Sequence, residues 1–194
     1  MRDENENLIP TSEEFQIQDL LKAAPLVFDI CAEIEDPAEL ANLKLNEQPK
    51  HGGYLLYGNR DSEGYFVSKG YIFLGELQPH QVGSKTSESR YITYWRAVFS
   101  KCCEKAGRYC EFPDFNYLKP VPLGCAEDQG TGLIVAFSGF LEKKDELFIL
   151  TLMLATGIIT PERATYIAKR HKNDLFLKNQ GDIFEKIQNL KLQN

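Results

Sequence analysis

Residues 131–157 read TGLIVAFSGFLEKKDELFILTLMLATG and decide the fold, because they set a short apolar run directly before a longer one. The first run, GLIVAF, is bounded by turn residues and is typical of a strand covered on both faces. Ser138 and Gly139 end this apolar run. A polar first helical turn then leads into LFILTLMLA, in which only Thr151 is polar. We therefore predict a strand over 132–138 and a nearly surrounded helix over 142–156.

The apolar part of this helix is about half the length that a bilayer-crossing helix needs, so we interpret it as a core helix and expect no membrane association. Asp145 and Glu146 lie in its first turn. Acidic residues there favour a helix N-terminus over the acid/base pair of an enzyme.

Length and cysteine content favour an ordinary intracellular protein. With 194 residues and 43% hydrophobic content, the chain can bury a core of its own without staples. Its five cysteines are an odd number and form no CxxC pair, and the acidic start MRDENENLIP is unlike a targeting peptide. We expect reduced thiols and a cytoplasmic location.

The net charge of -6 is unevenly distributed. Residues 1–47 carry twelve acidic and three basic side chains, whereas residues 160–194 carry seven basic and four acidic ones. The basic excess at the end is too sparse for a duplex-binding surface, so we expect no nucleic acid partner. The acidic start is read as a solvated face, with docking to a basic partner as the alternative.

Helix signals dominate the first 45 residues. Thr11 with Glu14 three residues later makes a capping box, and Pro25 is expected to kink or end the helix that follows. Asp36 followed by Pro37 is a second helix start.

The pattern changes after His51, where GGYLLYG and YFVSKGYIFLG flank the turn NRDSEG. We predict strands over 53–58 and 65–74, paired antiparallel because the connection is too short for a parallel crossover, with a turn or bulge at Ser68-Lys69-Gly70. Strand aromatics are explained by packing alone, but they also suit a flat ligand. The candidate ligand-binding residues are Tyr54, Tyr57, Tyr71, His51 and His80.

A long helix is predicted over 87–106, with Gly107 as its stop and Val98 and Cys102 on its core stripe, which Tyr91 and Trp95 continue. The polar turn that begins at Glu127 gives the strand over 132–138 a hairpin partner.

Together these elements predict an α+β domain over residues 1–157, with a central antiparallel sheet, packed helices and a helical N-terminal segment. Residues 158–194 are predicted to form a helical C-terminal extension. Thr160 followed by Pro161 is a helix start, Arg163 to His171 is helical, and a last helix begins at Asp182. Phe176, in the predicted connector, is too apolar for water. It must dock on this domain as part of a lid, on a second copy in a homo-oligomer, or on another partner.

Two segments resemble a known family. GGYLLYGNRDS is similar to the GGHLLAFxRMDG strand and turn of the GlcG-like family, which includes extracellular haem-binding proteins and the corrinoid-associated PduO C-terminal domain. PVPLGCAEDQGTGLIVAFSGFLEKKDELF resembles that family's LPLVxDGxVVGAIGVSGxxxxQDExx, in the same order along the chain. The resemblance covers residues 10–157 and implies a profilin-like sandwich in which small ligands bind. It also implies haem as a possible cofactor.

No pattern amounts to a catalytic signature: a Gly-rich phosphate loop, HExxH and GxSxG are all absent from the sequence. The three histidines are scattered and are interpreted as surface residues, His171 among them. Cys110 is assigned to a loop, where Arg108 and Tyr109 make it the one thiol whose setting favours a lowered pKa and a nucleophilic role.

Three hypotheses follow. The first is a non-catalytic module that binds a planar or small organic ligand against the aromatic strands. The second is an interaction protein that docks to protein partners through its acidic helical front and its tail. The third is a cysteine-dependent enzyme.

Overall fold

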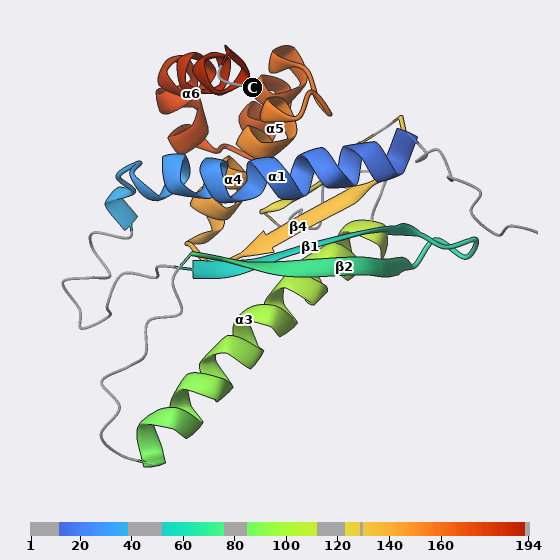
Figure 1. Cartoon of the computed structure of the whole chain (residues 1–194), viewed down its shortest axis with the longest axis vertical. Helices are drawn as coiled ribbons and strands as arrows, with labels where there is room; N and C mark the ends of the chain where they lie inside the picture. The colour runs from blue at the N-terminus through green and yellow to red at the C-terminus, as the bar shows by residue number, and fades with distance from the viewer. Residues whose placement is uncertain (1–11, 39–51, 76–84, 112–122, 129, 193–194) are drawn as a thin grey trace, which may run out of the picture.

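The computed structural model describes residues 12–38, 52–75, 85–111, 123–128 and 130–192; among these, the side chains of 12–13, 85–95, 111 and 190–192 are not described. The chain folds as an α+β structure around one antiparallel sheet with the order β2-β1-β4-β3 (Figure 1). The strands are β1 (Gly52–Arg60), β2 (Phe66–Gly75), β3 (Cys125–Glu127) and β4 (Ile134–Ser138). The α+β prediction is thus confirmed.

Helices cover both faces of the sheet. They are α1 (Ser12–Ala32), α3 (Lys85–Glu111), α4 (Glu142–Ala155), α5 (Pro161–Arg170) and α6 (Asp174–Leu192). Helix α3 packs on one face, over β1 and β4, while α1 and α4 pack on the other (Figure 1). Helices α5 and α6 pack on the outer side of α4.

The period of two along the strands separates two apolar clusters. Leu55 of β1 pairs with Phe137 of β4, and both belong to the large cluster under α1 and α4. The next residue, Leu56, pairs with Ala136 and belongs to a smaller cluster with Cys102 of α3. The sheet is therefore apolar on both faces, as the continuous apolar run of β4 predicts.

Helix α4 is the centre of the molecule. Every residue from Lys144 to Leu154 is buried, the predicted bounds of 142–156 differ from the observed ones by a single residue, and the prediction of a nearly surrounded helix is confirmed. Its apolar side chains contact the sheet on one side and the tail helices on the other.

Truncating α4 should therefore be costly. Leu150→Ala is expected to lower the free energy of unfolding by about 2–5 kcal/mol, because Leu150 has no exposed surface and its loss leaves a cavity. Tyr65→Ala, where the side chain is 62% exposed, is the control and should change stability by less than about 0.5 kcal/mol. Urea unfolding of both variants compares the two, and equal small losses would contradict the burial of α4.

The C-terminal extension docks on this chain rather than staying apart. Phe176 is fully buried in the same cluster as the α4 side chains, so docking on this domain is the alternative that the structure selects. The predicted start of α5 is confirmed, since Thr160 caps it and accepts from the Arg163 amide at 3.2 Å. The predicted connector was wrong: α6 runs unbroken through Gly181, because Phe176, Ile183 and Ile187 form one buried stripe.

Two other residues that break helices by preference do not end them. Pro25 was expected to kink or end the first helix; it does not end α1, which continues to Ala32, and the Pro25 side chain is exposed. Gly107 does not stop α3, because Ala106 and Cys110 continue its buried stripe to the end of the helix. Tertiary packing overrides the local helix-breaking preference at both positions.

Two further predictions have a partial outcome. The Asp36 side chain accepts from the Ala38 amide at 2.9 Å, as expected of a helix N-cap, and the residues beyond it lie outside the described ranges. Tyr91 and Trp95 fall within α3, but their side chains are outside the described part of the chain. Among the helices described, none combines the length and the apolar character that crossing a membrane requires.

Candidate binding face

Four aromatic side chains gather on the α3 side of the sheet and define what we call the aromatic face: Tyr54, Tyr71, Phe73 and Phe99. Tyr54 of β1 pairs directly with Phe73 of β2, so both project from the same face, and Tyr71 follows two residues away on that face. Phe99 reaches them from α3. Cross-strand aromatic pairs of this kind are a common source of sheet stability.

The rings are ordered by mutual edge-to-face contact. The ring centroid of Tyr54 lies 5.2 Å from that of Phe73 and 5.3 Å from that of Phe99, and the centroids of Tyr71 and Phe99 are 4.9 Å apart. All these pairs are T-shaped, which is a favoured geometry for aromatic rings. The rings therefore form a preformed apolar surface with little rotamer freedom left to lose.

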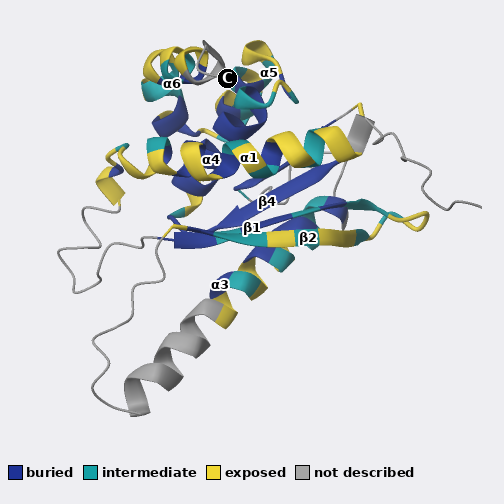
Figure 2. Cartoon of the chain, in the orientation of Figure 1, coloured by how far each residue is buried: buried dark blue, intermediate teal, exposed yellow. Residues whose placement is uncertain are grey.

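This surface is open on its β2 side. Helix α3 lies mainly over β1 and β4, and β2 carries a long row of exposed and half-buried residues (Figure 2). Tyr71 is 58% exposed, while Tyr54, Phe73 and Phe99 are half-buried. The aromatic face therefore combines one exposed ring with three half-buried ones.

The predicted ligand-binding residues separate into three groups. Tyr54 and Tyr71 lie together on the aromatic face. Tyr57 does not, because it projects from the opposite face of the sheet and packs against the large cluster. His51 and His80 are outside the described residues. Phe73 and Phe99 were not among the predicted ligand-binding residues, although Phe73 is one of the strand aromatics and Phe99 lies one turn before Cys102, on the side of the helix that helical spacing places against the sheet.

A β-bulge limits the aromatic face. The register of β1 and β2 shifts between Tyr57 and Gly58, which leaves Lys69 as the extra residue and confirms the predicted irregularity. A side chain at Gly70 would displace the Tyr57 ring, because a Cβ atom there would lie 2.3 Å from the Tyr57 hydroxyl oxygen. Such bulges, together with a lysine, are typical devices that prevent edge strands from pairing with other chains. Contacts to this region are therefore expected on its face.

The cysteine hypothesis receives no support from Cys110. The residue lies in the last turn of α3, not in a loop, and its side chain is buried. Burial raises the pKa of the Cys110 thiol, and the nearby Arg60 only partly opposes this. Arg60 instead donates a hydrogen bond of 2.8 Å to the Cys110 carbonyl and pairs with Glu127 at 2.9 Å. The expectation of a lowered thiol pKa was wrong, because desolvation outweighs the charge.

The other thiols are protected as well. All five cysteines are free, and four of them are buried. Burial raises the pKa of Cys31 and of Cys102 to about 12. In the described parts of the chain, His, Cys, Asp and Glu side chains form no group of three that could hold a metal ion.

Alkylation should reflect this burial. We expect Cys103, the one cysteine that is not buried, to react first with iodoacetamide in the folded protein, and the other four to react only after unfolding. Mass spectrometry of timed, quenched samples identifies the labelled residue. Early labelling of Cys110 would restore it as a candidate nucleophile.

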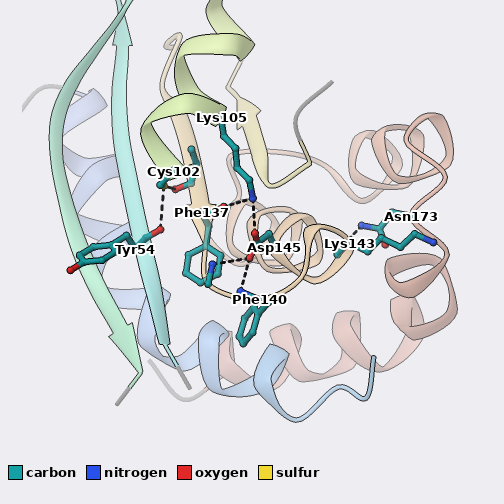
Figure 3. Close-up of polar contacts among 10 residues, drawn as sticks. Tyr54, Cys102, Lys105, Phe137, Phe140, Lys143, Asp145 and Asn173 are labelled. Atoms are coloured by element: carbon teal, nitrogen blue, oxygen red, sulfur yellow. Dashed lines mark hydrogen bonds and ion pairs between the residues drawn. The ribbon is translucent and has the colours of Figure 1, made fainter. Parts of the chain in front are cut away.

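A buried ion pair connects α3 with α4 and with the end of β4. Lys105 of α3 donates to Asp145 of α4 at 2.5 Å and to the carbonyl of Phe137 at 3.0 Å (Figure 3). The other carboxylate oxygen of Asp145 accepts from the amides of Gly139 and Phe140 at 3.1 and 2.8 Å. Burial raises the pKa of Asp145 to about 6, although Lys105 and the two amides oppose the shift.

Glycine is required next to this pair. Gly124 has a φ of +86°, and a Cβ there would lie 2.7 Å from the Cβ of Asp145. The pair therefore joins α3, α4, the end of β4 and the entry to β3 in one close-packed region.

A second buried acid holds the tail. Glu146 contacts Nδ1 of His171 and accepts from the Asn173 side-chain amide at 2.7 Å. The same amide donates to the carbonyl of Lys143 at 2.9 Å (Figure 3). His171 is thus largely buried, and the prediction that it is a surface residue was wrong. Asp145 and Glu146 are thus both buried, and each contacts groups on a neighbouring element.

Comparison of the chain with protein-family models, with curated proteins and with solved structures found no match.

Proposed function

We propose that the chain is a non-catalytic binding protein whose aromatic face takes a planar, largely apolar ligand. The observation that carries this proposal is the open cluster of four rings, with Tyr71 exposed and held by its neighbours. A flat ligand stacked on such a surface buries apolar area on both partners without first ordering the protein. The buried thiols and acids support a binding role over a catalytic one.

The resemblance to the GlcG-like family supports haem or another tetrapyrrole as the ligand class. The aromatic face is apolar, as is the flat ring of such a ligand. The four residues that define the face include no histidine, methionine or cysteine, which are side chains that ligate haem iron. The proposal therefore concerns stacking on the ring, and haemin serves as the first probe.

The test is a titration of the purified protein with haemin, followed by absorbance. We expect a Soret band that saturates at about one equivalent, and Tyr71→Ala should weaken binding by at least about tenfold, which corresponds to about 1.4 kcal/mol. Tyr65→Ala is the matched control, because Tyr65 is 62% exposed but lies outside the aromatic face. Equal weakening by both variants, or none by either, would contradict binding at this face.

A protein-interaction role is the second candidate. Two exposed large apolar residues on α1, Phe15 and Leu26, favour it, together with the acidic composition of that segment. The tail contributes less to this candidate than its sequence implies, since Leu175 and Phe176 are buried within the chain.

A further inference from the structure

The solvent-facing side of α1 combines apolar and acidic residues in one stripe. Phe15, Asp19, Lys22, Leu26 and Asp29 follow at spacings of four, three, four and three residues, which places them on one side of a helix, and all five are exposed. Residues 12–38 carry seven acidic side chains, and Lys22 is the one basic residue among them. We call the five residues the α1 stripe.

The outer face of α5 has the opposite charge. Tyr166 is 49% exposed, the guanidinium of Arg163 lies 5.4 Å from its ring centroid, and Arg170 donates to its hydroxyl at 3.0 Å. Lys169 is exposed beside them. Residues 161–172 carry four basic side chains and one acidic one. We call Arg163, Tyr166, Lys169 and Arg170 together the α5 face.

The α5 face has the composition of a contact site. Tyrosine and arginine are enriched among the residues that dominate binding energy at protein interfaces. Because Tyr166 already orders both arginines, a partner carboxylate would meet guanidinium groups that lose little further rotamer freedom.

We infer that the α1 stripe of one molecule docks on the α5 face of a second copy, and reciprocally, in a two-fold dimer. The two surfaces are complementary in net charge: the segment of the α1 stripe has an excess of carboxylates beside its apolar anchors, with Lys22 among them, and the α5 face has cations around an exposed aromatic ring. In a two-fold dimer each copy contributes both surfaces, so the contact is made twice. Figure 2 shows exposed residues along both α1 and α5. Within the chain, Lys186 of α6 already pairs with Glu33, just after α1, at 3.3 Å, which is likewise an ion pair between an acidic residue at α1 and a basic residue of the tail.

Salt is the first test. The full chain should sediment as a dimer at about 0.05 M salt and shift toward monomer at about 1 M salt, because charge attraction between exposed groups is screened. A chain that stays monomeric at low salt and high protein concentration would overturn the inference.

Charge reversal identifies the surfaces. The acidic-side variant carries Asp19→Lys and Asp29→Lys, and the basic-side variant carries Arg163→Glu and Lys169→Glu. Each variant alone should be monomeric, because like charges then face each other, with dissociation at least about tenfold easier. An equimolar mixture should form a heterodimer, because both reciprocal contacts again join opposite charges.

A control separates this contact from a general charge effect. Lys101→Glu reverses an exposed charge on α3, far along the chain from both surfaces, and should leave the dimer intact. At about 1 M salt, where the wild type is also expected to be monomeric, melting curves of the variants should match it, because the changed residues are exposed or half-buried. If the mixture stays monomeric although each variant is folded, these surfaces do not join two copies and a different acidic or basic partner is required. Haemin titration is independent of this result, because the aromatic face lies on the other side of the sheet.

Discussion

Replacing Lys105 with methionine is expected to lower the free energy of unfolding by about 3–5 kcal/mol at neutral pH. The substitution keeps the aliphatic bulk but leaves Asp145, whose side chain is 2% exposed, without its cation. Only the amides of Gly139 and Phe140 then remain as donors. An isolated buried carboxylate is far more costly than a paired one.

Urea unfolding measures the loss. The control on the same helix is Arg108→Met, which removes an exposed i,i+4 pair with Glu104 and should cost less than about 0.5 kcal/mol. Similar small effects of the two substitutions would show that Lys105 and Asp145 do not form the buried pair described above.

The effect should also depend on pH. The pKa of Asp145 is raised to about 6 in the folded protein, from an ordinary value of 3.8. The carboxyl's contribution to stability is therefore fully present below about pH 4 and is lost as the pH rises through about 6. Removing Lys105 raises the pKa of Asp145 further. The loss of unfolding free energy caused by Lys105→Met should therefore be smaller at pH 5 than at pH 7, by about 1–2 kcal/mol. Equal penalties at both pH values would mean that Asp145 is not the group concerned.

The second large effect concerns the tail. Phe176→Ala is expected to lower the free energy of unfolding by about 3–5 kcal/mol, because a fully buried phenylalanine leaves a cavity between α6 and α4. A chain ending at Gly157 should lose its folded state or aggregate, since the outer side of α4 would be exposed.

The control for this prediction is Tyr65→Ala, an exposed aromatic truncation that should shift the melting temperature little. Thermal unfolding and sedimentation of the three proteins give the comparison. If the chain ending at Gly157 kept the melting temperature of the full chain and stayed monomeric, the tail would not be part of the core.

The central part of the fold is readable from the sequence because burial there is continuous. In β4 and α4 almost every side chain is buried, so an apolar run marks each element directly. The helices at the two ends are harder, because local signals conflict with packing. Pro25 and Gly181 both break helices by preference, yet α1 and α6 continue through them, since the buried residues on either side share one stripe.

The aromatic face was only partly predictable. Tyr54 and Tyr57 are an odd number of residues apart in a strand, so the period of two already separates them, and the sequence could have excluded one from any shared site. The pairing of β1 with β2 then decides which tyrosine joins Tyr71. The Lys105–Asp145 pair joins positions 40 residues apart and has no local sequence signal.

The most direct test of ligand binding at the aromatic face is an NMR titration of protein carrying ¹³C-labelled tyrosine and phenylalanine rings. On addition of haemin or a diamagnetic analogue with zinc in the ring, we expect the signals of Tyr54, Tyr71, Phe73 and Phe99 to shift first, because they form the surface on which the ligand stacks. Tyr57, on the opposite face of the sheet, and the exposed Tyr65 and Tyr166 should keep their positions. Saturable shifts confined to Tyr57, Tyr65 or Tyr166, with the four rings unchanged, would contradict the proposal.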